Sequence, residues 1–311
     1  MKAVVTGGAG FIGSQVVRQL ETVGVGEIWA VDNFYSGKPG NLEGTRAKLV
    51  EADICDYAAM EEALKGATYV FHLAAIPSVP RSIEYPVPSH EVNINGTFNV
   101  LRAAVAGKVK RVVYAASSSA YGDTEVLPKV ETMKPNPRSP YAAQKLMGEH
   151  YCSVFTNCFG LETVSLRFFN VFGPRQDPTS PYSGVLSLFM KSLITGEAPT
   201  IFGDGEQSRD FTYVEDVAEL VWKASQAEGV AGEVINAGNG NRYTLNETWA
   251  MLCKVTGREM AAKYGAPRAG DVRHSQADTR LAREKLGHAP RFSFEEGLRR
   301  TFDWYRESFS A

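Results

Sequence analysis

Apolar positions in the first half of the chain fall into short β-branched runs, separated by segments in which apolar residues recur at helical spacing. The runs that predict buried parallel strands are 2–6, 27–32, 68–74, 110–117 and 162–168. The segments that predict helices are 11–23, 57–65, 91–106 and 141–158. This alternation predicts an α/β fold with a doubly wound parallel sheet of the Rossmann type.

After about residue 170 the pattern loosens into loop-rich stretches and shorter helices. We therefore expect two units. A sheet domain would comprise residues 1–169 and about 210–237. A smaller, discontinuous C-terminal lobe would comprise about 170–209 and 238–311 and would cover the carboxyl ends of the strands.

Composition narrows the class of protein. The net charge of −2 gives no reason to expect a nucleic-acid partner. The four cysteines form no C-x-x-C pair, which favours reduced thiols over disulfides or a zinc site, and no metal is expected. No apolar segment approaches the ~20 residues that span a membrane, and the N-terminal apolar run is too short for a signal peptide. We expect a soluble cytoplasmic protein.

A glycine-rich turn follows the first predicted strand and opens the first predicted helix. Gly7, Gly10 and Gly13 have the spacing G-x-x-G-x-x-G. Such glycines allow a tight turn, a close approach of the backbone to a pyrophosphate, and close packing of helix on strand. An ordinary glycine-rich turn is the alternative, but the position between strand and helix favours a dinucleotide site.

Two acidic residues indicate which dinucleotide this is. Asp32 ends the second predicted strand, where a carboxylate can accept hydrogen bonds from an adenosine ribose and repel a 2′-phosphate. Asp53, after a third strand, could reach the adenine edge. Although Lys38 is nearby, no arginine follows Asp32 directly, so NAD is favoured over NADP. A solvated turn residue is the alternative for Asp32.

Tyr141 and Lys145 are four residues apart, which places them on one face of a predicted helix. A phenol has a pKa of about 10, and lowering it to about 7 requires about 4 kcal/mol. A unit charge ~4 Å away supplies about this much at an effective dielectric of ~20. We expect Lys145, helped by an oxidised nicotinamide, to make Tyr141 a working acid/base. Ser117, at the end of the fifth strand, would be the third partner; an exposed helix pair and a polar turn are the alternatives.

These motifs together resemble the extended short-chain dehydrogenase/reductase family over nearly the whole chain. Within it, the sequence is most similar to nucleotide-sugar 4-epimerases of the UDP-glucose/UDP-N-acetylglucosamine type. The stretches that carry this finer resemblance are "SVPRSI", "YAASSSAYGD", "LRFFNVFGPRQDP", "GDGEQSRDFTYVEDV" and "RAGDVRHSQAD".

The resemblance implies a chemistry at the sugar C4 and a set of cofactor contacts. Tyr141 would remove the proton from O4, Ser117 would hydrogen-bond the same oxygen, and Lys145 would bind the nicotinamide ribose. Hydride would pass from C4 to a tightly bound NAD and return to the opposite face of the 4-keto sugar. The NAD-binding positions implied are Gly7, Gly10, Phe11, Ile12, Gly13, Asp32, Asn33, Asp53, Ile54, Leu73, Ala74, Ala75, Asn93, Tyr141, Lys145 and Phe169.

Substrate positions are implied mostly by the second half. Asn170 would contact the nucleotide sugar, Arg209 the diphosphate, Arg268 a phosphate and Asp271 the uridine ribose; guanidinium groups suit a diphosphate. An arginine in a loop is more often a surface charge, and only the motifs single these out. The full substrate set is Ser78, Ser117, Ser118, Tyr141, Asn170, Arg209, Arg268, Asp271 and Ser275.

Two positions depart from relatives with other activities. Related 4,6-dehydratases have an Asp-Glu pair directly after the active-site hydroxyl, where this chain has Ser118 and Ser119. Dehydration is thereby disfavoured, and so is decarboxylation of a glucuronate. At Ser275, some epimerases carry a bulky residue that excludes a 2-N-acetyl group, so we expect this pocket to admit one.

Some alternatives remain open from the sequence. They are a 4-ketoreductase or a 4,6-dehydratase acting on a nucleotide sugar, a non-catalytic NAD-binding regulator, and thymidine in place of uridine. His72 is expected to be a satisfied core histidine. The resemblance also implies a homodimer, formed when helices around 91–106 and 141–158 pack into a four-helix bundle.

Overall fold

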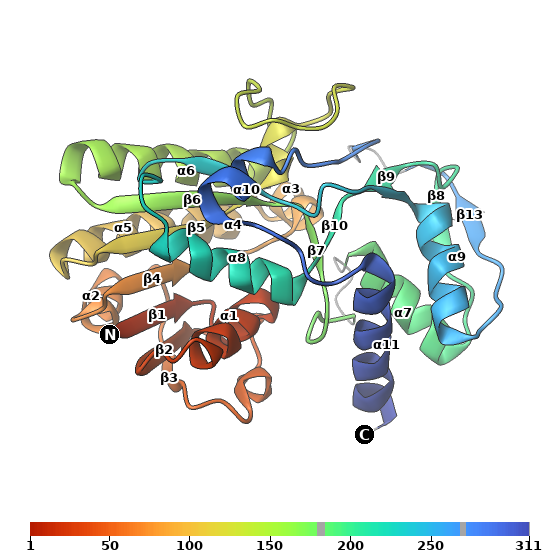
Figure 1. Ribbon diagram of the computed structural model, residues 1–311, viewed down its shortest axis with the longest axis horizontal. Helices are drawn as coiled ribbons and strands as arrows, with labels where there is room; N and C mark the ends of the chain where they lie inside the picture. The colour runs from red at the N-terminus through yellow and green to blue at the C-terminus, as the bar shows by residue number, and fades with distance from the viewer. Residues whose placement is uncertain (179–183, 268–271, 311) are drawn as a thin grey trace.

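The computed structural model describes residues 1–178, 184–267 and 272–310. Its centre is a parallel sheet with the strand order β11-β6-β5-β4-β1-β2-β3 (Figure 1). The strands are β1 (Lys2–Thr6), β2 (Glu27–Asp32), β3 (Lys48–Glu51), β4 (Tyr69–His72), β5 (Arg111–Ser117), β6 (Glu162–Phe168) and β11 (Val234–Ala237). The predicted Rossmann-type α/β sheet is confirmed.

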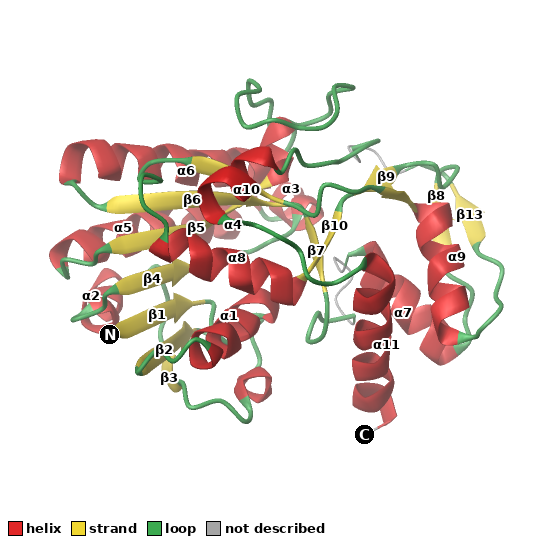
Figure 2. Cartoon of the chain, in the orientation of Figure 1, coloured by secondary structure: helices red, strands yellow, loops and turns green. Residues whose placement is uncertain are grey.

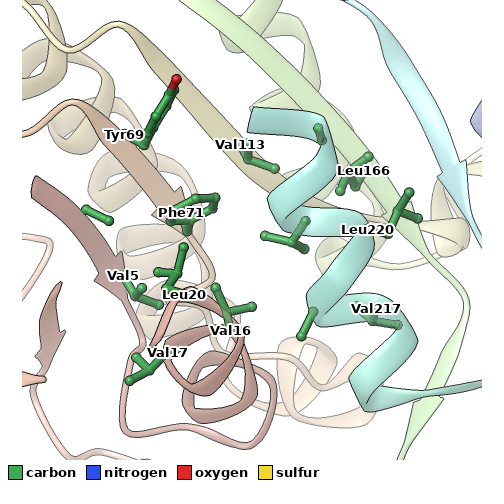
Figure 3. Close-up of a cluster of buried hydrophobic side chains, with 14 of the residues drawn as sticks. Val5, Val16, Val17, Leu20, Tyr69, Phe71, Val113, Leu166, Val217 and Leu220 are labelled. Carbon is green, nitrogen blue, oxygen red and sulfur yellow. The ribbon is translucent and has the colours of Figure 1, made fainter. Parts of the chain in front are cut away.

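Helices cover both faces of this sheet. One face packs against α1 (Phe11–Thr22), α8 (Val214–Gln226) and α10 (Arg280–Leu286). The other packs against α2 (Tyr57–Leu64), α5 (Thr97–Ala106) and α6 (Pro140–Phe159). Because successive strand residues point to opposite faces, Val5 joins the first cluster and Val4 the second. Val16 and Leu20 of α1 belong to the same buried cluster as Val217 and Leu220 of α8, and these four residues are labelled in Figure 3.

All the predicted strands are present, and the sheet has one more, β11. The third strand expected before Asp53 is β3, although its residues are mostly exposed and have little apolar patterning. β11 is only four residues long and lies far along the chain. The predicted helix 91–106 is divided into a π-helical segment, Glu91–Gly96, and α5. Two short helices, α3 (Val79–Glu84) and α4 (Pro86–His90), precede it.

A second core lies beyond the carboxyl ends of the sheet strands, toward which their arrowheads point in Figure 2. Its helices are α7 (Val185–Thr195), α9 (Leu245–Thr256) and α11 (Phe294–Ser310). Three small strand pairs accompany them, and these are β7 (Asn170–Phe172) with β10 (Phe211–Tyr213), β9 (Ser208–Arg209) with β12 (Tyr243–Thr244), and β8 (Thr200–Phe202) with β13 (Lys263–Gly265).

The chain passes repeatedly between the two cores. After α9 it returns to the sheet, where α10 contributes Ala282 and Leu286 to the cluster around α1 and α8. It then leaves again for α11, whose Leu298 and Tyr305 are buried in the second core. Helix α10 thus packs on the sheet, although residues 238–311 were expected to belong to the C-terminal lobe. Across residues 1–178, 184–267 and 272–310, no helix is both long and apolar enough to cross a bilayer.

Candidate active site

The glycine-rich turn joins β1 to α1 and runs directly beneath the loop that follows β4. A Cβ atom on Gly7, whose φ is +69°, would lie 2.8 Å from the Ala74 nitrogen. A Cβ atom on Gly13 would lie 2.0 Å from the Gly7 oxygen. Both positions therefore require glycine. The turn delivers the chain to the N-terminus of α1 at Phe11 and Ile12, where backbone amides can bind a phosphate.

Asp32 ends β2 beside this turn. Its Oδ2 accepts a hydrogen bond from the Ala9 amide over 3.0 Å, and its Oδ1 accepts one from the Phe34 amide over 2.9 Å. Burial raises the pKa of Asp32, and these amide hydrogen bonds partly offset that rise. The carboxylate thus lies in the wall of the crevice, next to the glycine turn, and is not a solvated turn residue.

Asn33 and Asp53 form the next part of the same wall. The Asn33 Nδ2 donates to Asp53 Oδ2 over 2.9 Å, and the Cys55 amide donates to Asp53 Oδ1 over 2.8 Å. Burial opposes the charge of Asp53, but these hydrogen bonds hold its pKa below the ordinary value. Ile54 is buried, and Gly96 of the π-helical segment approaches it so closely that a Cβ there would lie 2.6 Å away.

The loop after β4, which contains Leu73, Ala74 and Ala75, is held by Asn93. The Asn93 Oδ1 accepts a hydrogen bond from the Ile76 amide over 2.8 Å, and its Nδ2 donates to Gln144 Oε1 of α6 over 2.9 Å. Asn93 is 1% exposed. Asn93, a predicted cofactor residue, therefore links the loop after β4 to the helix that bears Tyr141.

His72 is buried at the end of β4. Its two ring nitrogens lie 2.7 Å from Thr6 Oγ1 and 3.0 Å from Thr97 Oγ1. Burial, with the nearby Lys145 charge, lowers the pKa of His72 to about 3. The prediction of a satisfied core histidine is confirmed.

Tyr141 is the second residue of α6, which begins after the cap residue Ser139. The Tyr141 amide donates to the Ser82 hydroxyl of α3 over 3.0 Å. One turn later, Lys145 is 4% exposed, and its Nζ donates to the Ala115 carbonyl of β5 over 2.8 Å. An exposed helix pair is excluded, because the lysine is buried against the sheet.

The protein's own groups do not lower the pKa of Tyr141, so the predicted lowering depends on the expected help of an oxidised nicotinamide. Burial raises the pKa of Tyr141 to about 12, and a hydrogen bond between the phenol and Ser117 offsets this only in part. Burial likewise lowers the pKa of Lys145 to about 8. Desolvation of the phenolate is thus the main cause of the raised pKa of Tyr141, and the Lys145 ammonium group donates its hydrogen bond to Ala115.

The Ser117 hydroxyl lies at the carboxyl end of β5, where a short turn follows. It accepts hydrogen bonds from the Ser119 amide over 3.2 Å and from the Ser119 hydroxyl over 2.8 Å. Ser118 is half-buried at the start of this turn. The turn ends at Tyr121, whose ring centroid lies 6.4 Å from that of the buried Phe169 after β6.

Three of the predicted substrate residues meet around strand β9. The Asn170 amide donates to the Asp210 carbonyl over 3.0 Å, and the Ser275 amide donates to the Ser208 carbonyl over 3.0 Å. Arg209 lies between these two contacts along the chain, and its Nη1 donates to the Arg273 carbonyl over 3.3 Å.

The other predicted substrate residues have different positions. Ser78 caps α3, and its hydroxyl accepts a hydrogen bond from the Arg81 amide over 3.2 Å. Arg268 and Asp271 lie outside the described residues.

A buried carboxylate that the sequence analysis missed joins these segments. Asp210 is fully buried and accepts hydrogen bonds from the amides of Asn239, Gly240 and Ala277, each over 2.8–2.9 Å. Burial raises the pKa of Asp210 to about 6, although the hydrogen bonds from these amides act to lower it. Its position after Arg209 in "SRDF" is the only sequence signal, and nothing in that pattern distinguishes a buried acid from an exposed one.

A pocket of about 320 Å³ opens between α7 and β8, and it reaches Gln207, the residue before strand β9. Its lining includes Leu188, Phe189, Thr200, Ile201, Phe202 and Gln207. Gln207 is two residues before Arg209, so the pocket adjoins the predicted diphosphate site. The sequence analysis did not single out these residues, because apolar residues on α7 also fit an ordinary helix core.

Comparison with known proteins shows similarity to nucleotide-sugar epimerases over nearly the whole chain. Residues 3–238 match the NAD dependent epimerase/dehydratase family. The putative UDP-glucose 4-epimerase of Methanocaldococcus jannaschii is 36% identical over 312 residues, which cover 98% of each chain. The structure of the Thermotoga maritima UDP-glucose 4-epimerase with UDP-glucose has a TM-score of 0.95 and 40% identity, covering 99% of this chain and 100% of that one.

A UDP-N-acetylglucosamine 4-epimerase from Methanobrevibacter ruminantium, solved with UDP-N-acetylmuramic acid, has a TM-score of 0.94 and 38% identity. The alignment covers 99% of this chain and 98% of that one. The predicted resemblance to extended short-chain dehydrogenases/reductases and the predicted cofactor, NAD, are confirmed by these matches. The chain belongs to the NAD-dependent epimerase/dehydratase family.

Proposed function

We propose that this protein is an NAD-dependent 4-epimerase of UDP-hexoses, which interconverts UDP-glucose with UDP-galactose and UDP-N-acetylglucosamine with UDP-N-acetylgalactosamine. The observation that carries the proposal is the meeting of Tyr141, Lys145 and Ser117 at the carboxyl edge of a sheet whose first strand ends in the glycine-rich turn. Related enzymes with UDP-glucose and UDP-N-acetylglucosamine activities support both substrate pairs.

The catalytic roles follow from the local electrostatics. Bound NAD would supply the hydride acceptor and donor for oxidation and re-reduction at the sugar C4. Tyr141 takes the proton from O4 and gives it back, and Ser117 hydrogen-bonds the same oxygen. Because the protein's own groups leave the pKa of Tyr141 at about 12, the phenolate needs further positive charge nearby to form near neutral pH. Lys145 supplies part of this charge and fixes its position through Ala115.

The proposed cofactor residues form two groups, one at the glycine-rich turn and one on the β2 side. Gly7, Gly10 and Gly13, with Phe11 and Ile12, give the pyrophosphate access to the N-terminus of α1. On the β2 side, the partly buried carboxylate of Asp32 accepts a ribose and disfavours a 2′-phosphate. The remaining proposed contacts are Asn33, Asp53, Ile54, Leu73, Ala74, Ala75, Asn93, Lys145 and Phe169.

The nucleotide sugar would bind across strand β9. Arg209 suits a diphosphate, and the adjoining pocket of about 320 Å³ offers Phe202 for stacking and Gln207 for hydrogen bonding to a base. Asn170, Ser78 and Ser118 complete the proposed set on the described residues, and Arg268 and Asp271 join it by resemblance. In this proposal residues 1–169 and about 210–237 bind NAD, and about 170–209 and 238–311 bind the nucleotide sugar.

Two features separate this reaction from its closest rivals. Ser118 and Ser119 have no carboxyl group to protonate a leaving hydroxyl, which disfavours a 4,6-dehydratase. Ser275 is a small, half-buried residue beside β9, which leaves room for a 2-N-acetyl group. A 4-ketoreductase would consume reduced cofactor in proportion to product, whereas the epimerase would consume none.

The protein would act as a cytoplasmic homodimer. Helices α5 and α6 lie side by side, since the Phe98 ring lies 5.3 Å from Tyr151 and 5.8 Å from Phe155. Outward from this contact, Met147, Val154 and Phe159 of α6 are 44%, 46% and 57% exposed. An exposed apolar helix face of this kind favours pairing with a second copy into a four-helix bundle.

Proton NMR of the purified protein with UDP-N-acetylgalactosamine, and separately with UDP-galactose, tests the proposal when no cofactor is added. Gluco-configured signals that grow at constant total sugar would support 4-epimerisation with retained NAD. A folded, NAD-loaded protein that converts neither sugar would overturn the proposal and favour a non-catalytic regulator. Loss of sugar signals to a 4-keto-6-deoxy product would favour the dehydratase.

A further inference from the structure

The loop after β2, residues 33–38, reaches across the crevice above β1. In the sheet order β4-β1-β2, strand β1 lies between β4 and β2. A side chain after β2 that contacts an element after β4 must therefore pass above the carboxyl end of β1, where the glycine turn begins. The Tyr35 side chain makes a contact of this kind, and the Lys38 side chain contacts the segment after β7.

The two contacts are made with different elements, α3 and the segment after β7. The Arg81 guanidinium of α3, after β4, lies over the Tyr35 ring at 4.8 Å from its centroid. The Lys38 Nζ lies 3.1 Å from Asp177 Oδ2, in the segment after β7. Tyr35 is 52% exposed, and the Lys38 and Asp177 side chains are 61% and 34% exposed. Both contacts are thus at the mouth of the crevice, where they can open.

The backbone of the loop is fixed at its start. The Asp32 Oδ1 accepts the Phe34 amide, and the Asn33 Oδ1 accepts the Tyr35 amide over 3.1 Å. Phe34 has a φ of 57°, a left-handed conformation that costs a non-glycine residue energy and turns the chain outward. Gly37 then crosses directly over Asp32, because a Cβ there would lie 2.6 Å from the carboxylate.

The loop is also fixed at its end. The Lys38 amide donates to the Ala9 carbonyl of the glycine turn over 3.0 Å, and Asn41 Nδ2 donates to the same oxygen over 2.8 Å. A backbone tied at both ends leaves the side chains of Tyr35 and Lys38 as the parts that can move.

We propose that the pairs Tyr35–Arg81 and Lys38–Asp177 form a clasp that closes over the bound dinucleotide and slows its release. The loop that carries Tyr35 and Lys38 is hydrogen-bonded to Ala9 of the glycine turn, so the two contacts would hold it over a dinucleotide bound at this turn. This inference needs only NAD binding, which the family relationship establishes. Its benefit to turnover rests on the proposed function, since an epimerase reuses one NAD in successive cycles.

The test measures how fast bound NAD exchanges in the purified holoenzyme, by a chase with excess labelled NAD and without any sugar. Tyr35→Ala and Lys38→Glu should each speed release about threefold, and the two changes together about tenfold, as expected for one exposed cation–π contact and one exposed ion pair. Lys65→Glu, which reverses a charge in the exposed pair with Glu62, is the matched control and should leave release unchanged.

A charge reversal distinguishes the clasp from a direct contact of Lys38 with the NAD phosphates. Lys38→Glu combined with Asp177→Lys should restore slow release, because the ion pair is rebuilt with its signs exchanged. Tyr35→Phe should also keep slow release, because the ring face remains. Fast release in the reversed pair, or unchanged release in Tyr35→Ala and Lys38→Glu variants with normal circular dichroism, would overturn the clasp. Absence of epimerase activity in the wild type would overturn only the proposed function.

Discussion

Glu149 and Arg167 form a two-pronged ion pair, in which Arg167 Nε and Nη2 donate to the carboxylate over 2.9 and 2.7 Å. Their side chains are 3% and 4% exposed. Burial opposes the charge of the guanidinium, but the Glu149 carboxylate raises the pKa of Arg167 above its usual range. Glu149 lies two turns after Tyr141, so this pair anchors the Tyr141 helix to β6.

Replacing one partner of this pair should therefore be costly. Glu149→Gln leaves the buried guanidinium without a counter-charge, and we expect a loss of about 3–5 kcal/mol in the free energy of unfolding by urea. Glu296→Gln, in the exposed pair with Arg300, is the control and should cost less than about 1 kcal/mol. Equal losses in the two variants would contradict the prediction.

Tyr141→Phe should remove the acid/base and leave the fold intact. Because proton transfer by a placed side chain contributes about 10²–10⁴-fold to rate, kcat should fall by that factor while the protein still carries NAD. Tyr151→Phe, on the same helix, should retain normal kcat. A Tyr141→Phe enzyme with wild-type kcat would assign the proton transfer to another group.

His72 should make stability depend on acidity. The unfolded chain binds a proton at this residue below about pH 6.5, whereas the folded protein, with the pKa of His72 at about 3, does not. The unfolded state then binds more protons, so stability falls as pH falls through this window, by ~1.4 kcal/mol per pH unit from this residue.

Urea unfolding of wild type and His72→Gln between pH 7 and 4 measures this slope, which should be shallower in the variant even if its stability is lower throughout. Parallel curves for wild type and His72→Gln would show that His72 does not contribute.

Ser275→Tyr should change specificity without destroying activity. A phenol beside β9 would occupy space proposed for the 2-N-acetyl group, so turnover of UDP-N-acetylgalactosamine should be abolished while UDP-galactose is spared. The ratio of kcat/KM for the two substrates is the measurement. An equal loss for both would indicate general damage to the site and would refute the open-pocket explanation.

Val154→Glu should separate the proposed homodimer. A charge at the centre of the exposed α6 face would have to be buried without a partner on pairing, which is unfavourable. Size-exclusion chromatography with light scattering should detect a monomer at concentrations where the wild type is a dimer. Val23→Glu, at the end of α1 and 39% exposed, should leave the dimer intact.

Local spacing was enough to predict the parts of the fold and site that depend on neighbouring residues. Strands β1 and β2, the glycine turn, and the shared face of Tyr141 and Lys145 are all short-range features. Strand β11 was not predicted, because it is only four residues long and lies after the regular alternation of strands and helices has loosened.

Features that depend on distant contacts could not be predicted in this way. Asn170, Arg209 and Ser275 are far apart in sequence, and they meet only because the backbone and buried carboxylate of Asp210 link the segments around them. The effect of burial on the Tyr141 pKa could not be predicted for a related reason, since desolvation depends on everything packed around the phenol.

The repeated passage of the chain between its two cores limits how the protein can be recombined. Segments from β6, α8, β11 and α10 build the sheet core, and segments from β7, α7, α9 and α11 build the other, in alternation. A chimaera made with a relative at a single crossover point between α7 and α10 would mix parental side chains inside both cores at once. Exchange of substrate preference by grafting therefore requires several splice points, chosen where the backbone leaves one core for the other.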